Sequence, residues 1–538
     1  MVFARRSTTL LAAIIASCAM VLSLTACTSD NKTVVDGQTT VTSNSAGGVA
    51  VFTPSDGITL NQQTPLNKWA KLVPDLAKAL ADAGFKKGDI DHTTSDSLAK
   101  QSRAIQDFVV DHLSNNTTDD SGIAIAPDNM TLLVAPVVEA DASTRQYGDY
   151  ISQNLSTNDA TDEGATSDGE SSEDDSSNTE SDSTASDEQA QAVDRLVSSL
   201  KLAKESGMHV VLLGNSIEGY KPDAFVKFSD AQTIGKLQAE KMVSKLKLDK
   251  ASKDNPKYIE VLLPYTAVDE KGNANDSAFA QEAFRGIWQV LGSYYQKGVV
   301  ESPSGTLDGK STENDWQAVA YDAAEEGSTA KVLDKRLAKT DGQSTLTRID
   351  GIITMNDYIA SEVVKELDDL GYTGSAADIN PQITISGIVG NITGKKDLSR
   401  DAVPDPIKSP ENDNANDSSS SDDDADEDTS ASDKDRDSQW PLVTGYGAYV
   451  SNIPSIVNGK QWMTGMEDRQ TIATDIAQAC AKLNKDEALN SMPSIRNSEV
   501  GGVKKIPTIS EPLLAVSASN LKSALIDPGY ISLADAGL

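Results

Sequence analysis

The chain has 538 residues and a formal net charge of −34 at pH 7, with 81 Asp and Glu against 47 Lys and Arg. This length is ample for two folded units with their own cores, and the acidic balance argues against a nucleic-acid-binding protein. His92, His112 and His209 are scattered without the spacing of zinc ligands, so we predict no metal site and no cofactor.

Most of the negative charge lies in two low-complexity stretches. Residues 156–189 contain 12 Asp and Glu and no Lys or Arg, and residues 411–438 contain 12 Asp and Glu against Lys434 and Arg436. Together they contribute −22 of the −34. Almost no apolar residue occurs in either stretch, so burial cannot offset the entropy of ordering them, and both are predicted to be disordered insertions.

The N-terminus is typical of an export signal. Arg5 and Arg6 precede an apolar run over residues 10–24, and residues 1–26 are predicted to be removed. The sequence Leu24-Thr25-Ala26-Cys27 resembles a bacterial lipoprotein box, which implies that Cys27 carries the lipid and that residues 27–48 form a flexible tether. A transmembrane anchor is the alternative, but the run is short and no basic cluster follows it.

Strand and helix patterns alternate along the rest of the chain. Buried strands are predicted at 49–53, 132–138, 210–214, 225–228, 258–264, 349–355, 383–387 and 442–445. Amphipathic helices are predicted at 68–85, from 105 onward, and at 192–206, 231–248, 278–291, 332–338 and 359–370. This alternation predicts an α/β fold of two similar Rossmann-like lobes with parallel, helix-covered sheets.

Asn356 and Asp357 are the first site candidates. They come directly after the strand at 349–355 and before the helix at 359–370, which Gly371 closes as a predicted C-cap. Ligands of open α/β sheets lie outside the carboxyl ends of strands, so both side chains are candidate ligand contacts. The alternative is that Asn-Asp only caps the helix.

Several segments resemble one family in the same order along the chain. They are Ala135-Pro136-Val137, residues 352–372, the run VTGYGAYVSNIPSIVNGKQWMTGMEDR at 443–469, and the closing segment 503–537. The chain from about Gly48 to Leu538 resembles the monosaccharide-binding proteins of ABC importers, nearest to the xylose and multiple-sugar branch, with the type I periplasmic-binding fold. The resemblance implies two lobes joined by three crossings, with a sugar-like ligand between them.

The resemblance also implies ligand positions. Lys68-Trp69 stands where the family has Arg-Trp, Asp96 where an Asp follows the second strand, and Gln101 at a family Gln. Asp357 matches a sugar-binding Asp, and its neighbour Asn356 is included with it. The implied ligand-binding set is Lys68, Trp69, Asp96, Asn215, Asn275, Asn356, Asp357 and Tyr446.

The family's polar residues are altered at three places here. Asn215 replaces an Asp at the first crossing, Tyr446-Gly447 replaces Gln-Asp, and Glu467 stands where the family has a Lys. Because sugars are bound by amides and carboxylates that pair with adjacent hydroxyls, these changes bear on specificity.

The resemblance implies a lipid-anchored solute-binding protein that delivers a sugar-like molecule to an ABC permease, on the extracytoplasmic face of a bacterial membrane. A sensor or interaction lipoprotein with a degenerate cleft is the alternative. No enzyme is predicted, since no nucleophile elbow or phosphate-binding glycine loop occurs. The expected divisions are an N-terminal lobe at 49–220, a C-terminal lobe at 221–444, a return to the first lobe at 445–490, and a closing segment at 491–538.

Overall fold

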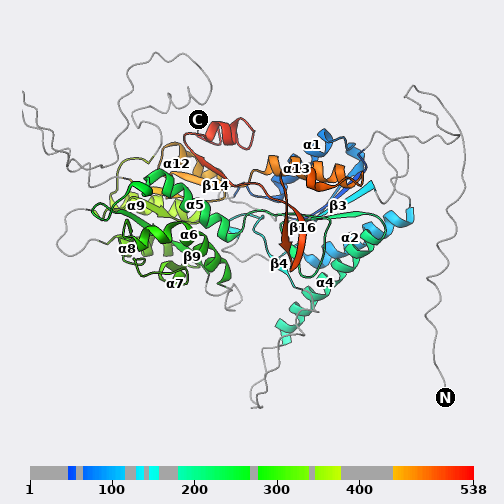
Figure 1. The fold of residues 1–538 in the computed structure, drawn as a ribbon, viewed down its shortest axis with the longest axis horizontal. Helices are drawn as coiled ribbons and strands as arrows, with labels where there is room; N and C mark the ends of the chain where they lie inside the picture. The colour runs from blue at the N-terminus through cyan, green and yellow to red at the C-terminus, as the bar shows by residue number, and fades with distance from the viewer. Residues whose placement is uncertain are drawn as a thin grey trace, which may run out of the picture. The chain divides into compact units, whose positions relative to one another are not determined.

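The computed structural model describes residues 46–55, 65–115, 129–138, 145–156, 180–266, 277–338, 346–376 and 440–537. Cys27, Asn275, the predicted strand at 383–387 and most of both acidic insertions lie outside these residues. The remaining chain forms two α/β lobes (Figure 1).

The N-terminal lobe is built on a seven-stranded sheet with the order β15-β16-β7-β5-β3-β1-β2. Its pairs are parallel except for the hairpin of β15 and β16. The strands are β1 (Gly48–Pro54), β2 (Ile90–Ser95), β3 (Met130–Val134), β5 (His209–Leu213), β7 (Ala224–Val226), β15 (Ile495–Val500) and β16 (Val503–Ile509).

Helices cover both faces of this sheet, because successive strand residues point to opposite sides. Val49 and Val51 of β1 join the apolar cluster under α1 (Trp69–Asp82) and α13 (Arg469–Leu483). Ala50 and Phe52 join the cluster under α2 (Leu98–Asn115) and α4 (Glu180–Glu205). Figure 1 shows the two helix pairs on opposite sides of the strands.

The C-terminal lobe has a four-stranded parallel sheet with the order β10-β8-β12-β13. Its elements are β8 (Lys257–Val261), β10 (Val300–Glu301), β12 (Gly351–Ile353) and β13 (Leu442–Thr444), with α5 (Ala231–Leu246), α6 (Ala278–Gln296), α8 (Ser328–Leu337) and α9 (Asp357–Leu370). Smaller pairs flank it, namely β9 (Leu263–Tyr265) with β11 (Ala320–Asp322), and β14 (Met463–Met466) with β17 (Leu514–Ser517).

Within the described residues, three segments connect an element of one lobe to an element of the other. The first crossing, residues 227–230, joins β7 to α5, and the second, residues 467–468, joins β14 to α13. The expectation that Asn215 lies at the first crossing is wrong, since Asn215 follows β5 within the N-terminal lobe. The third, residues 510–513, joins β16 to β17. The predicted fold of two lobes with parallel sheets and a three-crossing hinge is therefore confirmed.

Some predicted elements differ from those observed. The first acidic insertion was expected to run to Gln189 and the next helix to begin at residue 192, whereas α4 begins at Glu180. The part of α4 from Ala192 onward packs on the sheet. The strand β2, which the resemblance implied before Asp96, was not predicted from the hydrophobic pattern, because its sequence IDHTTS is mostly polar and its central residues are exposed at the edge of the sheet.

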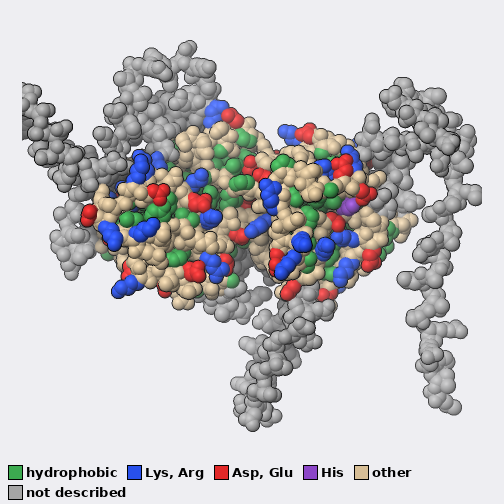
Figure 2. Space-filling model, viewed as in Figure 1, with side chains coloured by type: hydrophobic (Ala, Val, Ile, Leu, Met, Phe, Trp, Pro, Cys, Tyr) green, Lys and Arg blue, Asp and Glu red, His purple; other side chains and the backbone are tan. Residues whose placement is uncertain are grey.

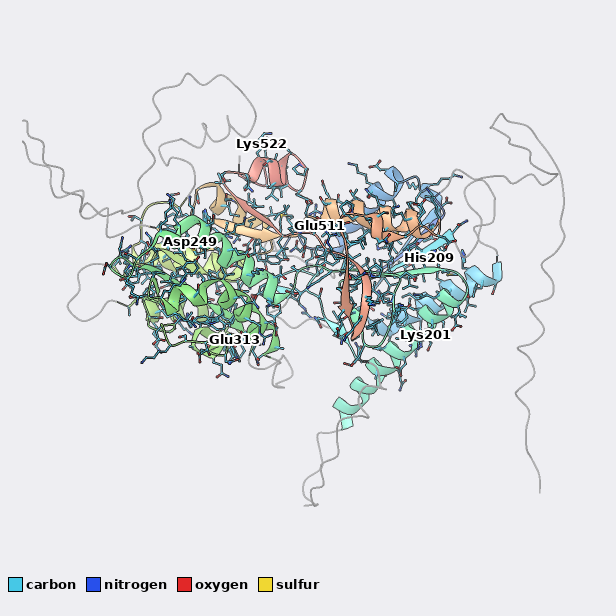
Figure 3. All side chains as sticks on the ribbon, viewed as in Figure 1. Lys201, His209, Asp249, Glu313, Glu511 and Lys522 are labelled. Atoms are coloured by element: carbon cyan, nitrogen blue, oxygen red, sulfur yellow. The ribbon has the colours of Figure 1, made fainter. Side chains whose placement is uncertain are left out.

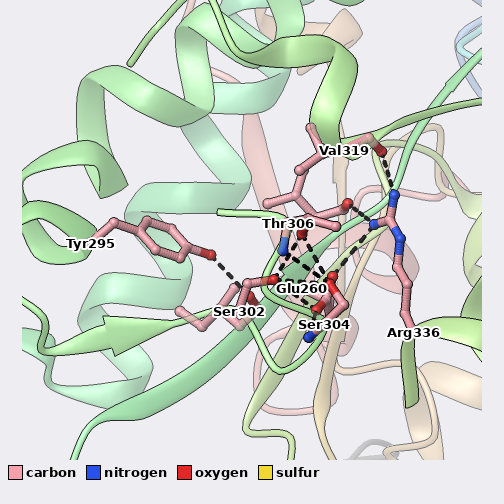
Figure 4. Close-up of polar contacts among 9 residues, drawn as sticks. Glu260, Tyr295, Ser302, Ser304, Thr306, Val319 and Arg336 are labelled. Carbon is pink, nitrogen blue, oxygen red and sulfur yellow. Dashed lines mark hydrogen bonds and ion pairs between the residues drawn. The ribbon is translucent and has the colours of Figure 1, made fainter. Parts of the chain in front are cut away.

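A buried ion pair between Glu260 and Arg336 connects several elements of the C-terminal lobe (Figure 4). Glu260 of β8 is fully buried and accepts hydrogen bonds from Ser302 Oγ at 2.7 Å and Ser304 N at 2.8 Å. Arg336 lies 3.4 Å from the other Glu260 oxygen and donates to two backbone carbonyl oxygens. Because both charges have several partners, the pair ties β8, α8 and the loop after β10 together.

Candidate ligand-binding site

Asn356 caps α9, which agrees with the interpretation of the Asn356-Asp357 turn as a helix cap. Its Oδ1 accepts from the backbone N–H of Ile359 at 2.9 Å, and Gly371 ends the helix with a φ of 91°. Its Nδ2 takes no part in the cap and instead donates to Gln146 Oε1 of the N-terminal lobe at 3.0 Å. Asn356 therefore combines a cap with a contact between the lobes.

Asp357 is fully buried, and its carboxylate is bound within its own lobe. It accepts hydrogen bonds from Tyr449 N at 2.9 Å, Thr464 Oγ1 at 2.8 Å and Gln461 Nε2 at 2.7 Å. Burial raises the pKa of Asp357 to about 6, while these bonds act in the opposite direction. The carboxylate thus fastens the start of α9 to the loop after β13 and to β14.

The backbone is strained at two positions beside these residues. Met355 and Ala448 have φ values of 69° and 49°, although neither is glycine. Gln238 Nε2 donates to Met355 O at 2.9 Å, and Thr464 Oγ1 accepts from Ala448 N at 3.1 Å. Such conformations cost about 1–3 kcal/mol each and are concentrated at ligand clamps and switch regions.

Four buried polar residues meet where the lobes join, and we call them the junction cluster: Asn67, Ser229, Tyr446 and Glu467. Tyr446 OH lies 2.5 Å from Ser229 Oγ, and Glu467 Oε1 accepts from Ser229 N at 2.5 Å. Glu467 N donates to Asn67 Oδ1 at 3.4 Å. Ser229 and Glu467 belong to the first two crossings, so the cluster couples both crossings to both lobes.

Two features of the junction cluster are unusual for buried groups. Asn67 is 2% exposed, and within the described residues its Nδ2 makes no well-formed hydrogen bond, although Asn67 lies close enough to Tyr446 to lower the pKa of that phenol. Burial raises the pKa of Glu467 to about 7, against the effect of its hydrogen bonds from Ser229. A buried donor without an acceptor costs about 1–3 kcal/mol, so its retention needs an explanation.

Lys68 and Trp69, predicted on the N-terminal lobe, both contact Asp149. Lys68 Nζ lies 2.9 Å from Asp149 Oδ1, and Trp69 N donates to Asp149 Oδ2 at 3.1 Å. The Trp69 ring is buried edge-on against Tyr150 and Phe228, with ring centroids 5.0 Å and 5.8 Å away. The Trp69 ring is therefore already covered by side chains of the protein.

The other predicted residues of this lobe lie in different surroundings. Asn215 is buried, donates to Pro136 O at 2.9 Å and accepts from Gln153 N at 2.9 Å. Gln101 is also buried and bonds to the backbone of Ala135 and Val137. Asp96 is exposed and pairs with Lys100 at 2.7 Å, which lowers its pKa. Asn275 lies outside the described residues.

Residues 146–153, which we call the interlobe segment, were missed by sequence reasoning. Tyr449 OH donates to Gln146 O at 2.7 Å, in addition to the contact of Gln146 with Asn356. The Tyr147 ring lies 4.7 Å from that of Phe279 and 6.3 Å from that of Tyr446. The Tyr-Gly-Asp-Tyr sequence of this segment predicts a turn but not a contact with the other lobe.

A surface hollow of about 500 Å³ lies elsewhere, at the amino-terminal edge of the first sheet. It is lined by His209 (labelled in Figure 3), Asp223, Asp486 and Asn497, among others. Asp223 is already paired with Lys204 at 2.8 Å. Within the described residues no group of three or more His, Cys, Asp or Glu could hold a metal ion.

Comparisons with known proteins give similar structures without a family assignment. No family model matches the chain, and no curated protein matches it. An ABC transporter solute-binding protein from Clostridium phytofermentans with bound β-D-glucose is 17% identical, with 91% of this chain and 99% of that chain covered and a TM-score of 0.44. A carbohydrate transporter solute-binding protein from Chloroflexus aurantiacus with D-glucose is 17% identical over 92% and 98% of the two chains, with a TM-score of 0.44.

A third is an ABC transporter solute-binding protein from Bacillus halodurans with bound myo-inositol, 11% identical over 90% of this chain and 98% of that one, with a TM-score of 0.37. All three are transporter solute-binding proteins. At these identities and TM-scores the likeness assigns neither a ligand nor a partner to this chain.

The surface and the helices add two observations. On the face drawn in Figure 2, Lys and Arg side chains are interspersed with Asp and Glu, without a broad field of one sign. Among the described helices none is both long and apolar enough to cross a bilayer.

Proposed function

We propose that this protein is the membrane-anchored substrate-binding component of an ABC transporter, which captures a monosaccharide or sugar-like solute for import. The solute would lie at the junction of the lobes, outside the carboxyl ends of β12 and β13. Lipid on Cys27 would hold the protein at the extracytoplasmic face of the bacterial membrane, where it meets the permease.

The observation that carries the proposal is the buried Nδ2 of Asn67 in the junction cluster, which makes no well-formed hydrogen bond within the described residues and has Tyr446 as its polar neighbour. A hydroxyl oxygen of a solute would accept from this donor, and Tyr446 OH and Glu467 lie beside it for neighbouring hydroxyls. Support also comes from the strained Met355 and Ala448 at the facing edge of the C-terminal lobe. Three crossings between two lobes permit the closure that removes water from a bound solute.

A second candidate is a sensor or interaction lipoprotein whose cleft no longer takes a solute. It is favoured by the finding that the predicted ligand side chains Lys68, Asn215 and Asn356 are already paired within the protein. Genes for an ABC permease and ATPase beside this gene would favour transport over this candidate.

The test is a thermal-shift screen of the full chain against monosaccharides and inositols. A solute that binds only the folded state at a hundred times its Kd stabilises by about 2.7 kcal/mol, which raises the melting temperature measurably. Asn67→Ala should abolish the shift, whereas Asn497→Ala, in the surface hollow, should retain it. A shift lost in Asn497→Ala and kept in Asn67→Ala would place binding in the hollow and contradict the proposed site.

A further inference from the structure

We infer that the interlobe segment is an internal ligand: Gln146 and Tyr147 occupy the ligand side of the C-terminal lobe and hold the two lobes together when no solute is bound. A solute would then bind in competition with the protein's own residues 146–153. The competition with a solute rests on the proposed function. The part of the inference that Gln146 and Tyr147 hold the lobes together does not.

The segment is anchored firmly on the N-terminal lobe. Asp149 pairs with Lys68 at 2.9 Å, and its backbone N–H donates to Asn67 O at 2.8 Å. Tyr150 OH donates to Lys68 O at 2.5 Å, and the Tyr150 ring stacks on Phe228 at 4.7 Å. These contacts fix residues 149–150 to the start of α1.

The preceding two residues, Gln146 and Tyr147, pack against the C-terminal lobe. Tyr147 is 1% exposed and is part of the apolar cluster of the C-terminal lobe, with Phe279 and Tyr446 as ring neighbours. Gln146 presents both of its oxygens to this lobe, the side-chain oxygen to Asn356 and the carbonyl oxygen to Tyr449. An amide and a phenol ring thus supply the hydrogen bonds and the apolar face that a polar ring ligand would offer.

Gly148 makes this change of lobe possible. Its φ is +100°, and a Cβ there would lie 2.6 Å from Asn67 O. Only glycine adopts this conformation without strain and leaves room for the backbone to pass so close to Asn67. The turn directs Tyr147 into one lobe and Tyr150 into the other.

The residues that the segment contacts are largely those predicted to bind the ligand. Asp149 pairs with Lys68 and Trp69, Gln153 bonds to Asn215, Gln146 bonds to Asn356, and the Tyr147 ring lies near Tyr446. Contacts drawn from both lobes converge on one short segment, as they do on a bound solute. Because both lobes contact it in this way, the interlobe segment occupies the proposed site and does more than connect two elements of the N-terminal lobe.

The test measures the distance between the lobes in the full, solute-free chain. Nitroxide labels on genetically encoded keto amino acids at the exposed positions Lys201 and Glu313 report one lobe each, and the native cysteines remain unmodified (Figure 3). The parent should give one narrow distance distribution. The double variant Gln146→Ala with Tyr147→Ala should add a longer population, with the closed-to-open ratio lowered about ten- to a hundredfold.

Gln153→Ala is the matched control, because it removes a glutamine side chain from the same segment and keeps the backbone bond to Asn215. It should match the parent. If circular dichroism shows that the double variant is unfolded, the single variant Gln146→Ala, whose side chain is only half-buried, must show a smaller shift in the same direction.

A broad distribution in the parent, or variants that match the parent, would overturn the inference. These outcomes do not depend on solute binding. A failed solute screen with a narrow parent distance would instead contradict the proposed function and leave the internal ligand in place.

Discussion

The hydroxyl of Tyr446 lies 2.5 Å from that of Ser229, so a side chain of the C-terminal lobe bonds directly to the first crossing between the lobes. Glu467, on the second crossing, accepts from the backbone N–H of the same Ser229. The hinge of this protein therefore contains a buried hydrogen-bonded cluster. Its members can be tested one at a time.

Tyr446→Phe removes the hydroxyl and leaves Ser229 Oγ without its buried partner. We expect the free energy of unfolding to fall by about 1–3 kcal/mol, measured by urea denaturation. Tyr294→Phe is the control, since Tyr294 bonds to Asp249 at the surface and should lose less than about 0.5 kcal/mol. Equal losses in the two variants would contradict a special role of the junction cluster.

Glu467 should make stability fall as pH rises. Its folded-state pKa is raised from 4.5 to about 7, so between these values the folded chain holds a proton that the unfolded chain releases. At one pKa unit per 1.36 kcal/mol, the loss across this window is on the order of 3 kcal/mol. Glu467→Gln should make the fall in melting temperature between pH 4.5 and 7 shallower, and should remove it between pH 6 and 7, where Asp357 no longer contributes.

The pH experiment has an internal reference in Asp357, whose pKa is raised to about 6 and which contributes to the decline at lower pH. Glu467→Gln should leave that part unchanged. A profile identical to that of the parent would show that Glu467 is solvated or is ionised without cost.

Asp357→Ala should act mainly on stability. The variant leaves the Tyr449 N–H, the Thr464 hydroxyl and the Gln461 amide without their acceptor, and we expect a loss of about 2–4 kcal/mol in the free energy of unfolding. Asp368→Ala, on the exposed side of the same helix, removes only the surface pair with Lys460 and should cost less than about 1 kcal/mol. If Asp357→Ala is as stable as the parent and only solute affinity falls, Asp357 is a direct ligand contact instead.

Arg336→Met should be among the most destabilising single changes in the C-terminal lobe. It leaves the Glu260 charge buried without its cation, which costs about 3–5 kcal/mol. Arg285→Met is the control, because Arg285 pairs with Glu282 at the surface. Chemical denaturation measures the free energy of unfolding of both variants. Comparable losses would contradict the claim that the buried pair stabilises the lobe more than the surface pair does.

Cys27→Ala should leave unprocessed precursor in the cells. The prediction depends on the lipoprotein-like box at residues 24–27, in which acylation of the cysteine precedes cleavage of the signal. Mass spectrometry of the membrane fraction measures the length and the lipid of the N-terminus. Cys480→Ala is the control and should mature normally, since Cys480 is a buried core residue. A mature, lipid-free Cys27→Ala protein would contradict the prediction.

Sequence patterns predicted the helices that pack on the sheets of the two lobes, but they missed an edge strand and the start of one helix. Helices such as 231–248 and 359–370 were predicted within two residues of their observed ends, because their apolar periodicity reflects the face that packs on a sheet. The polar edge strand β2 and the acidic start of α4 were not recognised, because pairing with a neighbouring strand and continuation of a packed helix do not alter local composition.

By itself, the sequence determined the α/β alternation and the turn at Asn356-Asp357, both of which depend on neighbours in the chain, while the export signal stays a prediction. Only the tertiary structure decided what these residues contact. Asn356 bonds to Gln146 across 210 residues, and Asp357 bonds to Thr464 across 107. The first bond depends on how the two lobes close on one another, and the second on how β14 packs beside α9 within one lobe. No local pattern of hydrophobicity or turn residues records either arrangement.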